Sequence, residues 1–223
     1  MAAQLTVMFG GHAYLARTTG ITYAEYVHQG FAQLCAATVL TLGVVGAAAA
    51  KARRATPRDR LTLRLALGVL CALALVVVGS ALYRMHVYEE AYGFTRLRLL
   101  VSVFEGWLGL VFLLVLVAGV RMRAAWLPMA TVVAAALALL GLAWLNPDAY
   151  IASHNIARFH ETGKLDTTYL AGLSADAVPQ LAGLPGDVAA CARGDAGQDD
   201  WLAWNLGRSR AAQVHLRVTG CGD

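Results

Sequence analysis

Residues 81–107, with the sequence ALYRMHVYEEAYGFTRLRLLVSVFEGW, gather ionisable side chains at the junction of two apolar stretches. The candidate polar site consists of Arg84, His86, Glu89, Glu90, Arg96, Arg98 and Glu105. Carboxylates and an imidazole this close together in sequence could accept protons or bind a ligand. The alternative is a rim of solvated, mutually paired charges at a membrane surface, where each pair contributes about 0–1 kcal/mol.

Glu105 stands apart because it lies inside the second apolar stretch. On a helix, Arg98, Ser102 and Glu105 share one stripe. A carboxylate within a membrane span is costly, so it is expected to face other helices and to have a partner, here Arg98 or Arg96. Three interpretations stay open: an ion pair that joins two helices, a proton-accepting or ligand-binding carboxylate in an outward-open pocket, and a passive protonated side chain.

Other candidate chemistry is weak. The spacing of His86, Glu89 and Glu90 matches no zinc motif. The sequence contains no GxSxG, HExxH, P-loop or GxGxxG pattern. A polar group in the C-terminal part is expected to be a solvated helix face; it consists of His154, Asn155, Arg158, His160 and Glu161. We therefore assign no catalytic residue, metal or cofactor, and a membrane-surface enzyme remains only an alternative.

The elements that position these residues follow from composition. Of 223 residues, 58% are hydrophobic and 14% charged, whereas soluble domains have roughly 45–50% and about 25%. Four apolar runs are long enough to cross a bilayer, which takes roughly 20 residues. They cover residues 31–50, 65–83, 99–120 and 124–145. The sequence thus predicts an all-α, polytopic membrane protein with four transmembrane helices.

Three regions follow from this assignment. Residues 1–30 form an extracytoplasmic arm with an interfacial helix that starts near Tyr23, residues 31–146 form the transmembrane region, and residues 147–223 form an extracytoplasmic helical tail. In the tail, Asn146, Asp166, Ser174 and Asp199 or Asp200 are the expected helix caps, and Gly163 is an expected stop. The apolar residues of 151–181 predict a small helical cluster.

Basic residues set the expected orientation. The formal charge is +4, and Lys and Arg are concentrated in the links at 51–60 and 121–123. Such links stay cytoplasmic, so the turn near residue 93 and the tail are expected outside the cell membrane. The same distribution argues against nucleic acid as a partner. Cys191 and Cys221 then lie in an oxidising compartment and are expected to form a disulfide.

Three stretches in combination resemble a bacterial membrane-protein family catalogued as domain of unknown function 4173. They are GITYAEYVHQGF, ALYRMHVYEEAYGFTRLRLLV and NPDAYIASHNIARFHETGKLDTTYLAGLSADAVPQL. The chain is similar to the C-terminal half of that family from about residue 9 to residue 206. The resemblance implies an integral membrane protein and no particular activity. It also implies further spans ahead of the first stretch, so the chain is expected to be a short member, a truncated one, or one whose start is misplaced.

The functional expectation is an integral membrane protein that acts through its outer surface as a scaffold, envelope-interaction or sensing component. Its expected partners are the lipid bilayer and either another membrane protein or a second copy of the chain. The alternative from another class is a transporter or channel subunit with an outward-facing polar site around Glu105.

Overall fold

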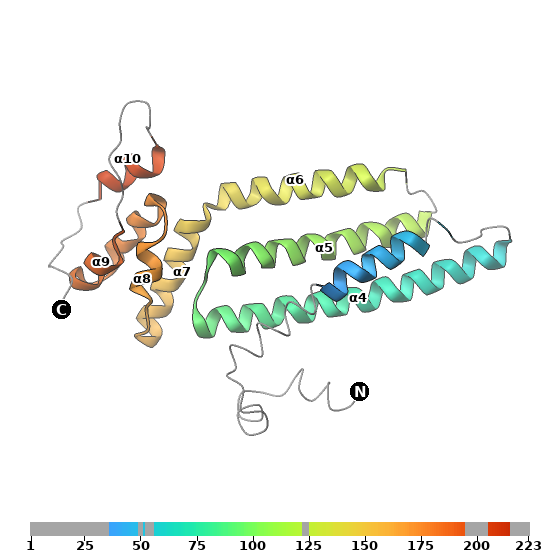
Figure 1. Cartoon of the computed structure of the whole chain (residues 1–223), viewed down its shortest axis with the longest axis horizontal. Helices are drawn as coiled ribbons and strands as arrows, with labels where there is room; N and C mark the ends of the chain where they lie inside the picture. The colour runs from blue at the N-terminus through green and yellow to red at the C-terminus, as the bar shows by residue number, and fades with distance from the viewer. Residues whose placement is uncertain (1–35, 49–50, 52–55, 122–124, 195–204, 215–223) are drawn as a thin grey trace, which may run out of the picture. The chain divides into compact units, whose positions relative to one another are not determined.

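The computed structural model describes residues 36–48, 51, 56–121, 125–194 and 205–214. All regular elements in these ranges are helices (Figure 1). Besides a helix at Ala36–Ala48, they are α4 (Pro57–Tyr92), α5 (Arg96–Arg121), α6 (Leu127–Leu145), α7 (Pro147–Thr162), α8 (Thr167–Ala171), the 3-10 helix η1 (Ala175–Gly183), α9 (Gly186–Ala192) and α10 (Leu206–Ala212). The prediction of an all-α chain is confirmed for the described residues. The predicted arm at 1–30 lies outside them.

Three helices, α4, α5 and α6, are long and apolar enough to cross a membrane, which identifies a membrane-embedded protein. The predicted first span is described only over Ala36–Ala48, which is shorter than a full crossing. Residues 31–35 and 49–50 lie outside the described ranges, so the fourth span stays a prediction.

Helix α4 is longer than the predicted span at 65–83 because its ends are capped outside the apolar run. The Thr56 backbone N–H donates to Asp59 Oδ2 at 3.0 Å, and the Asp59 N–H donates to Thr56 Oγ1 at 3.1 Å. This reciprocal pair is a capping box, and Pro57 occupies the first helical position. At the other end, Gly93 adopts a φ of 83° and stops the helix.

The chain divides into two compact units. The first comprises Met1–Tyr88 with Phe104–Val132, and the second comprises Glu89–Val103 with Val133–Asp223. In the first unit, the buried residues of α4 alternate at spacings of three and four, which is the pattern of a helix–helix seam. They are Cys71, Ala74, Val78, Ala81 and Met85. Cys71 and Ala74 form a core cluster with Val45 and Phe112.

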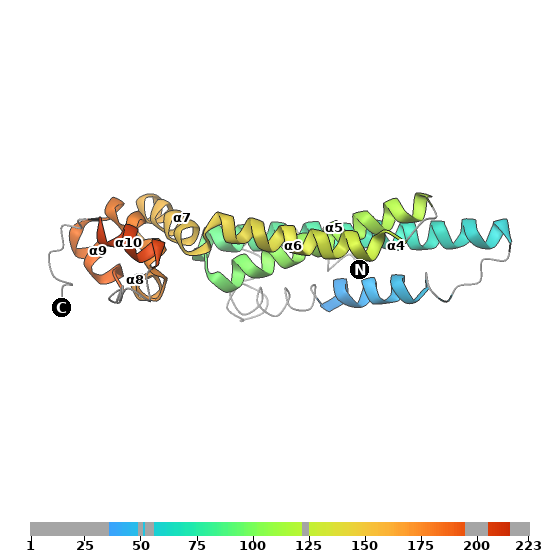
Figure 2. The same ribbon diagram turned by 90° about the horizontal axis from the view of Figure 1, so that it is seen from above.

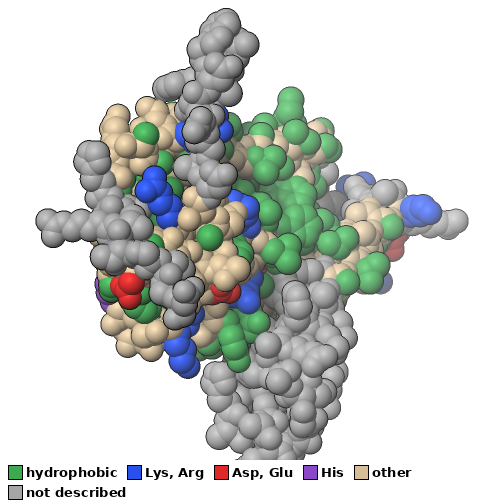
Figure 3. All heavy atoms as spheres, turned by 60° about the vertical axis from the view of Figure 1, so that its left-hand side comes forward, with side chains coloured by type: hydrophobic (Ala, Val, Ile, Leu, Met, Phe, Trp, Pro, Cys, Tyr) green, Lys and Arg blue, Asp and Glu red, His purple; other side chains and the backbone are tan. Residues whose placement is uncertain are grey.

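The second unit contains a group of short helices, α7 to α10, which both ribbon views show gathered together (Figure 2). Its core joins residues from α7, α8, η1 and α9, which confirms the predicted helical cluster. The buried members are Ala152, Ile156, Leu170, Ala177, Leu181, Leu184, Ala189 and Ala192. Figure 3 shows scattered charged side chains on the face of this group, whereas green apolar side chains gather on the long helices.

The structure confirms some of the predicted helix caps and differs from the prediction at others. Asp166 accepts a hydrogen bond from the Tyr169 N–H, and Gly163 ends α7 with a φ of 69°. Asn146 precedes α7 but adopts a left-handed φ of 52°, and neither it nor Ser174 makes a side-chain cap bond. The cap of α10 is Asn205, whose side chain accepts from two backbone N–H groups. Asp199 and Asp200 lie outside the described residues.

Candidate functional site

The link between α4 and α5 contains three residues, 93–95, at the place where the turn near residue 93 was predicted. Gly93 is required there because its φ of 83° is unfavourable for other residues. A Cβ atom at this position would also lie 2.7 Å from Asn155 Oδ1 and 3.3 Å from Arg158 Nη2. The turn backbone therefore approaches α7 closely, within the second unit.

Asn155 on α7 binds this turn through both ends of its amide. The Phe94 N–H donates to Asn155 Oδ1 at 2.7 Å, and Asn155 Nδ2 donates to the Phe94 carbonyl at 3.0 Å. Arg158, one turn later, donates from Nη1 to the Ala91 carbonyl at 3.0 Å. Both residues were expected on a solvated face. That prediction is wrong for Asn155, which is 8% exposed, because backbone groups freed at the end of α4 need partners.

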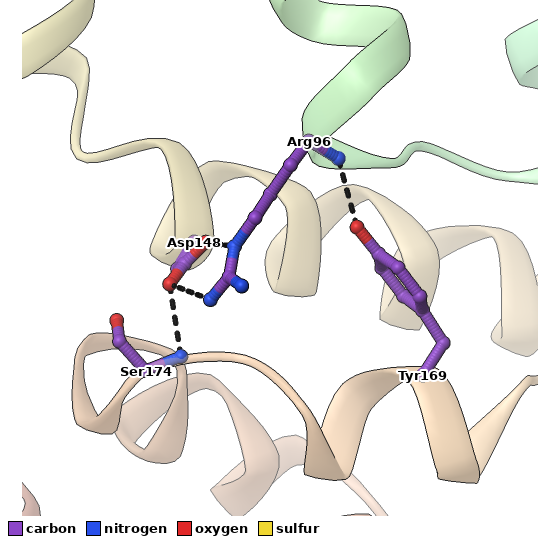
Figure 4. A network of polar contacts seen from close by, with 4 residues as sticks. All are labelled: Arg96, Asp148, Tyr169 and Ser174. Carbon is purple, nitrogen blue, oxygen red and sulfur yellow. Dashed lines mark hydrogen bonds and ion pairs between the residues drawn. The ribbon is translucent and has the colours of Figure 1, made fainter.

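Arg96, at the start of α5, forms a bidentate pair with Asp148 in the first turn of α7 (Figure 4). Nε donates to Oδ1 at 2.7 Å, and Nη2 donates to Oδ2 at 2.6 Å. The Ser174 N–H donates to the same Oδ2 at 2.8 Å, and the Arg96 N–H donates to the Tyr169 hydroxyl at 2.8 Å. One carboxylate thus connects α5, α7 and the segment before η1.

The charge of Asp148 is stabilised by this arrangement. Burial raises the pKa of its carboxyl, but the hydrogen bonds from Arg96 and Ser174 outweigh that effect and lower the pKa from 3.8 to about 2. Asp148 is therefore ionised at neutral pH. Fork-to-fork arginine–carboxylate pairs are directional as well as strong, so this pair fixes the orientation of α7 relative to the start of α5.

Sequence reasoning named Arg96 but missed its partner. Asp148 lies 52 residues away and was not among the candidate site residues. The side chain of Arg96 is 49% exposed, and the partner of its ion pair is Asp148 rather than a neighbouring residue of the candidate polar site. A carboxylate directly after Pro147 was the available signal, and nothing in the spacing links it to residue 96.

Glu105 lies in the first unit and is completely buried. Its Oε1 accepts a hydrogen bond from Thr38 Oγ1 at 3.2 Å, and its Oε2 has no hydrogen-bond partner among the described residues. The expected pairing with Arg96 or Arg98 is not found. Seven residues correspond to about 10 Å along a helix, and helical side chains point toward the N-terminus. Arg98 accordingly donates from Nη1 back to the Gly93 carbonyl.

The remaining candidate residues lie near the end of α4. Arg84 is half-buried, His86 and Glu90 are exposed, and Glu89 is buried at 6% exposure. Arg84, His86 and Glu105 belong to the first unit, whereas Glu89, Glu90, Arg96 and Arg98 belong to the second. In the described ranges, no group of three or more His, Cys, Asp or Glu residues is placed to hold a metal ion.

Cys191 in α9 is disulfide-bonded. Its predicted partner, Cys221, lies outside the described residues, so this particular pairing stays a prediction. Cys71 is a free, buried thiol in α4.

Comparison with curated proteins found no match, and comparison with solved structures found none. A family described as Domain of unknown function (DUF4153) matches residues 1–184 of the 223. The resemblance to family 4173 is therefore corrected: the expectation of a family of unknown function was right, and the particular family was wrong. Because the match covers most of the sequence, the chain belongs to the DUF4153 family.

Proposed function

We propose that the chain is an integral membrane protein whose C-terminal helical group serves as a scaffold, envelope-interaction or sensing part on the outer side of the bacterial cell membrane. The supporting observation is the set of polar bonds between this group and the α4–α5 turn. The carboxylate of Asp148 and the amide of Asn155 bind this turn within the second unit. A group that only filled space would not need two buried polar side chains in such bonds, because unsatisfied buried polar groups are costly.

Site-specific photo-crosslinking in intact cells tests this proposal. A photoreactive residue replaces Glu161 or Asp187, both of which are exposed on the helical group. We expect a discrete protein adduct, and we expect its yield to fall in an Asn155→Ala background, where the group is less firmly held. Leu140 on α6, 65% exposed, is the matched lipid-facing control. If neither position gives a protein adduct, the proposal is overturned.

A second candidate function is supported by one observation, the buried Glu105. One oxygen of this carboxyl group has no hydrogen-bond partner in the part of the chain that the structure describes. An ionisable side chain within a membrane span is a functional-site hypothesis by default. The corresponding function is a transporter or channel subunit in which Glu105 binds a proton or a cation. The Thr38 hydroxyl, 2% exposed, would then orient the carboxyl group.

Ion flux into proteoliposomes that contain the purified full chain tests this second function. We expect flux that Glu105→Gln abolishes and that Glu161→Gln leaves unchanged, since Glu161 is an exposed carboxylate on α7. Absence of wild-type flux for protons and common cations would remove this function. It would leave the interaction function standing, because crosslinking does not depend on transport.

A further inference from the structure

A groove in the second unit combines apolar and charged walls. It has a volume of about 260 Å³. Its lining includes the apolar side chains of Leu99, Leu100 and Leu142 and the charged side chains of Arg96, Asp148 and Asp176. Binding sites for small molecules share this composition of apolar walls with a few placed polar groups.

The walls are ordered along the two long helices that contribute to the groove. Arg96 is the first residue of α5, and Leu99 and Leu100 follow within about one turn. Leu142 lies within one turn of the end of α6, and Asp148 follows in α7. Both long helices are candidate spans, so the charged part lies where spans end and the leucines lie inside them. This change from charged to apolar residues along the groove matches the change from the headgroup to the acyl chains of a lipid.

The charges in the groove select among headgroups. Arg96 uses Nε and Nη2 for Asp148, and a guanidinium has five N–H donors. Its Nη1 makes no hydrogen bond to the described residues, so these donors can bind a phosphate. Asp176 is half-buried and supplies a carboxylate. The two carboxylates and one guanidinium leave a formal charge of −1, which disfavours an anionic headgroup and favours a cation beside a phosphate.

We propose that this groove binds the headgroup of a zwitterionic phospholipid with a primary ammonium, with the phosphate at Arg96, the ammonium at Asp176 and the acyl chains along Leu99, Leu100 and Leu142. The volume is somewhat below the roughly 300–1,000 Å³ of drug-sized pockets. It therefore suits a headgroup and the first part of the chains, while the rest of the lipid stays in the bilayer. This inference does not depend on either proposed function.

Native mass spectrometry of the full chain in detergent tests the proposal. The protein is mixed with equal amounts of phosphatidylethanolamine, phosphatidylcholine and phosphatidylglycerol that carry the same acyl chains. We expect phosphatidylethanolamine to be retained most, since phosphatidylcholine has no ammonium N–H and phosphatidylglycerol has no cation. Equal retention of the three lipids, retention of none, or a preference for phosphatidylglycerol would each overturn the proposal.

Variants locate the site. Asp176→Asn should reduce retained phosphatidylethanolamine about fivefold, the effect of losing one partly exposed ion pair, and Asp187→Asn, an exposed control in α9, should not. An unchanged preference for phosphatidylethanolamine in folded Asp176→Asn contradicts the assignment.

If that variant fails to fold, a second pair of variants tests the groove. Leu142→Trp fills the groove and should reduce retention of phosphatidylethanolamine, while Leu140→Trp on the exposed face of α6 should not. Equal retention by these two tryptophan variants would also overturn the proposal.

Discussion

Asp148 shows how one side chain connects several elements. Its two oxygens receive hydrogen bonds from Arg96 and from the backbone of Ser174. Bonds to a single carboxylate thus connect residue 96 with residue 174, which are separated by about a third of the chain's length. Arg96 is half exposed while Asp148 is mostly buried, so the pair itself adds modest net stability, yet the loss of Arg96 would leave the buried carboxylate uncompensated. The pair therefore matters most for the orientation of α7.

The acid dependence of stability follows from Asp148. Its pKa in the folded chain, about 2, is below the ordinary 3.8, so its contribution is present above about pH 4 and is lost as the pH falls through the folded value. The shift corresponds to about 2 kcal/mol at neutral pH. Asp148→Asn should lower the unfolding free energy by about that amount at pH 7 and flatten its fall between pH 4 and 2, as followed by thermal unfolding in detergent. An unchanged pH profile would contradict this assignment.

Two variants of Glu105 separate the contribution of its charge to stability from the contribution of its packing. Glu105→Gln keeps an oxygen that can accept from Thr38, so we expect its unfolding free energy within about 1 kcal/mol of wild type. Glu105→Ala removes a completely buried side chain, and the resulting cavity should cost about 2–5 kcal/mol. Thermal unfolding of both variants in detergent provides the comparison. If both leave folding and phenotype unaffected, Glu105 is neither a structural nor a functional residue.

At the scale of elements, the α4–α5 turn is short because Gly93 reverses the chain in three residues and α7 binds the exposed turn backbone. Gly93 and Gly163 both have positive φ, but a Cβ at Gly163 would meet nothing within 4 Å. The two glycines therefore provide a matched pair. The difference between them isolates the close approach of α7 from the backbone strain that both share.

Gly163→Ala should cost about 1–2 kcal/mol of stability from left-handed strain alone. Gly93→Ala should cost at least about 1 kcal/mol more, because its methyl group would displace Asn155 and Arg158. Thermal unfolding of the two variants tests this difference. Equal costs would mean that α7 does not approach the turn as described.

The seam on α4 gives a second test at this scale. Ala81 is completely buried, whereas Ala72 on the same helix is exposed. Ala81→Leu should overpack the seam and lower stability by about 1–3 kcal/mol, while Ala72→Leu should be nearly neutral since it faces outward. Unfolding in detergent compares the two variants directly, and a neutral Ala81→Leu would contradict helix packing through this seam.

At the scale of the whole molecule, the disulfide connects structure to orientation. Disulfides persist in oxidising compartments, so a bond at Cys191 agrees with the expected extracytoplasmic tail. The predicted Cys191–Cys221 pair leaves two of the four cysteines as thiols. Titration of the denatured, unreduced protein purified from membranes should therefore count two thiols per chain. Four thiols would exclude the disulfide. If the pair forms, the Cys191→Ser variant should give three thiols instead of two, because it releases Cys221.

Hydrophobic composition and periodicity by themselves determined that this chain is helical and embedded in a membrane, because runs of apolar residues need no distant information to predict a span. Local rules likewise located the turn at Gly93 and the stop at Gly163. The partners of Arg96, Glu105 and Asn155 were decided only by the tertiary structure. Side chains 52 to 67 residues apart meet through helix packing, and one sequence carries no signal for which helix faces meet.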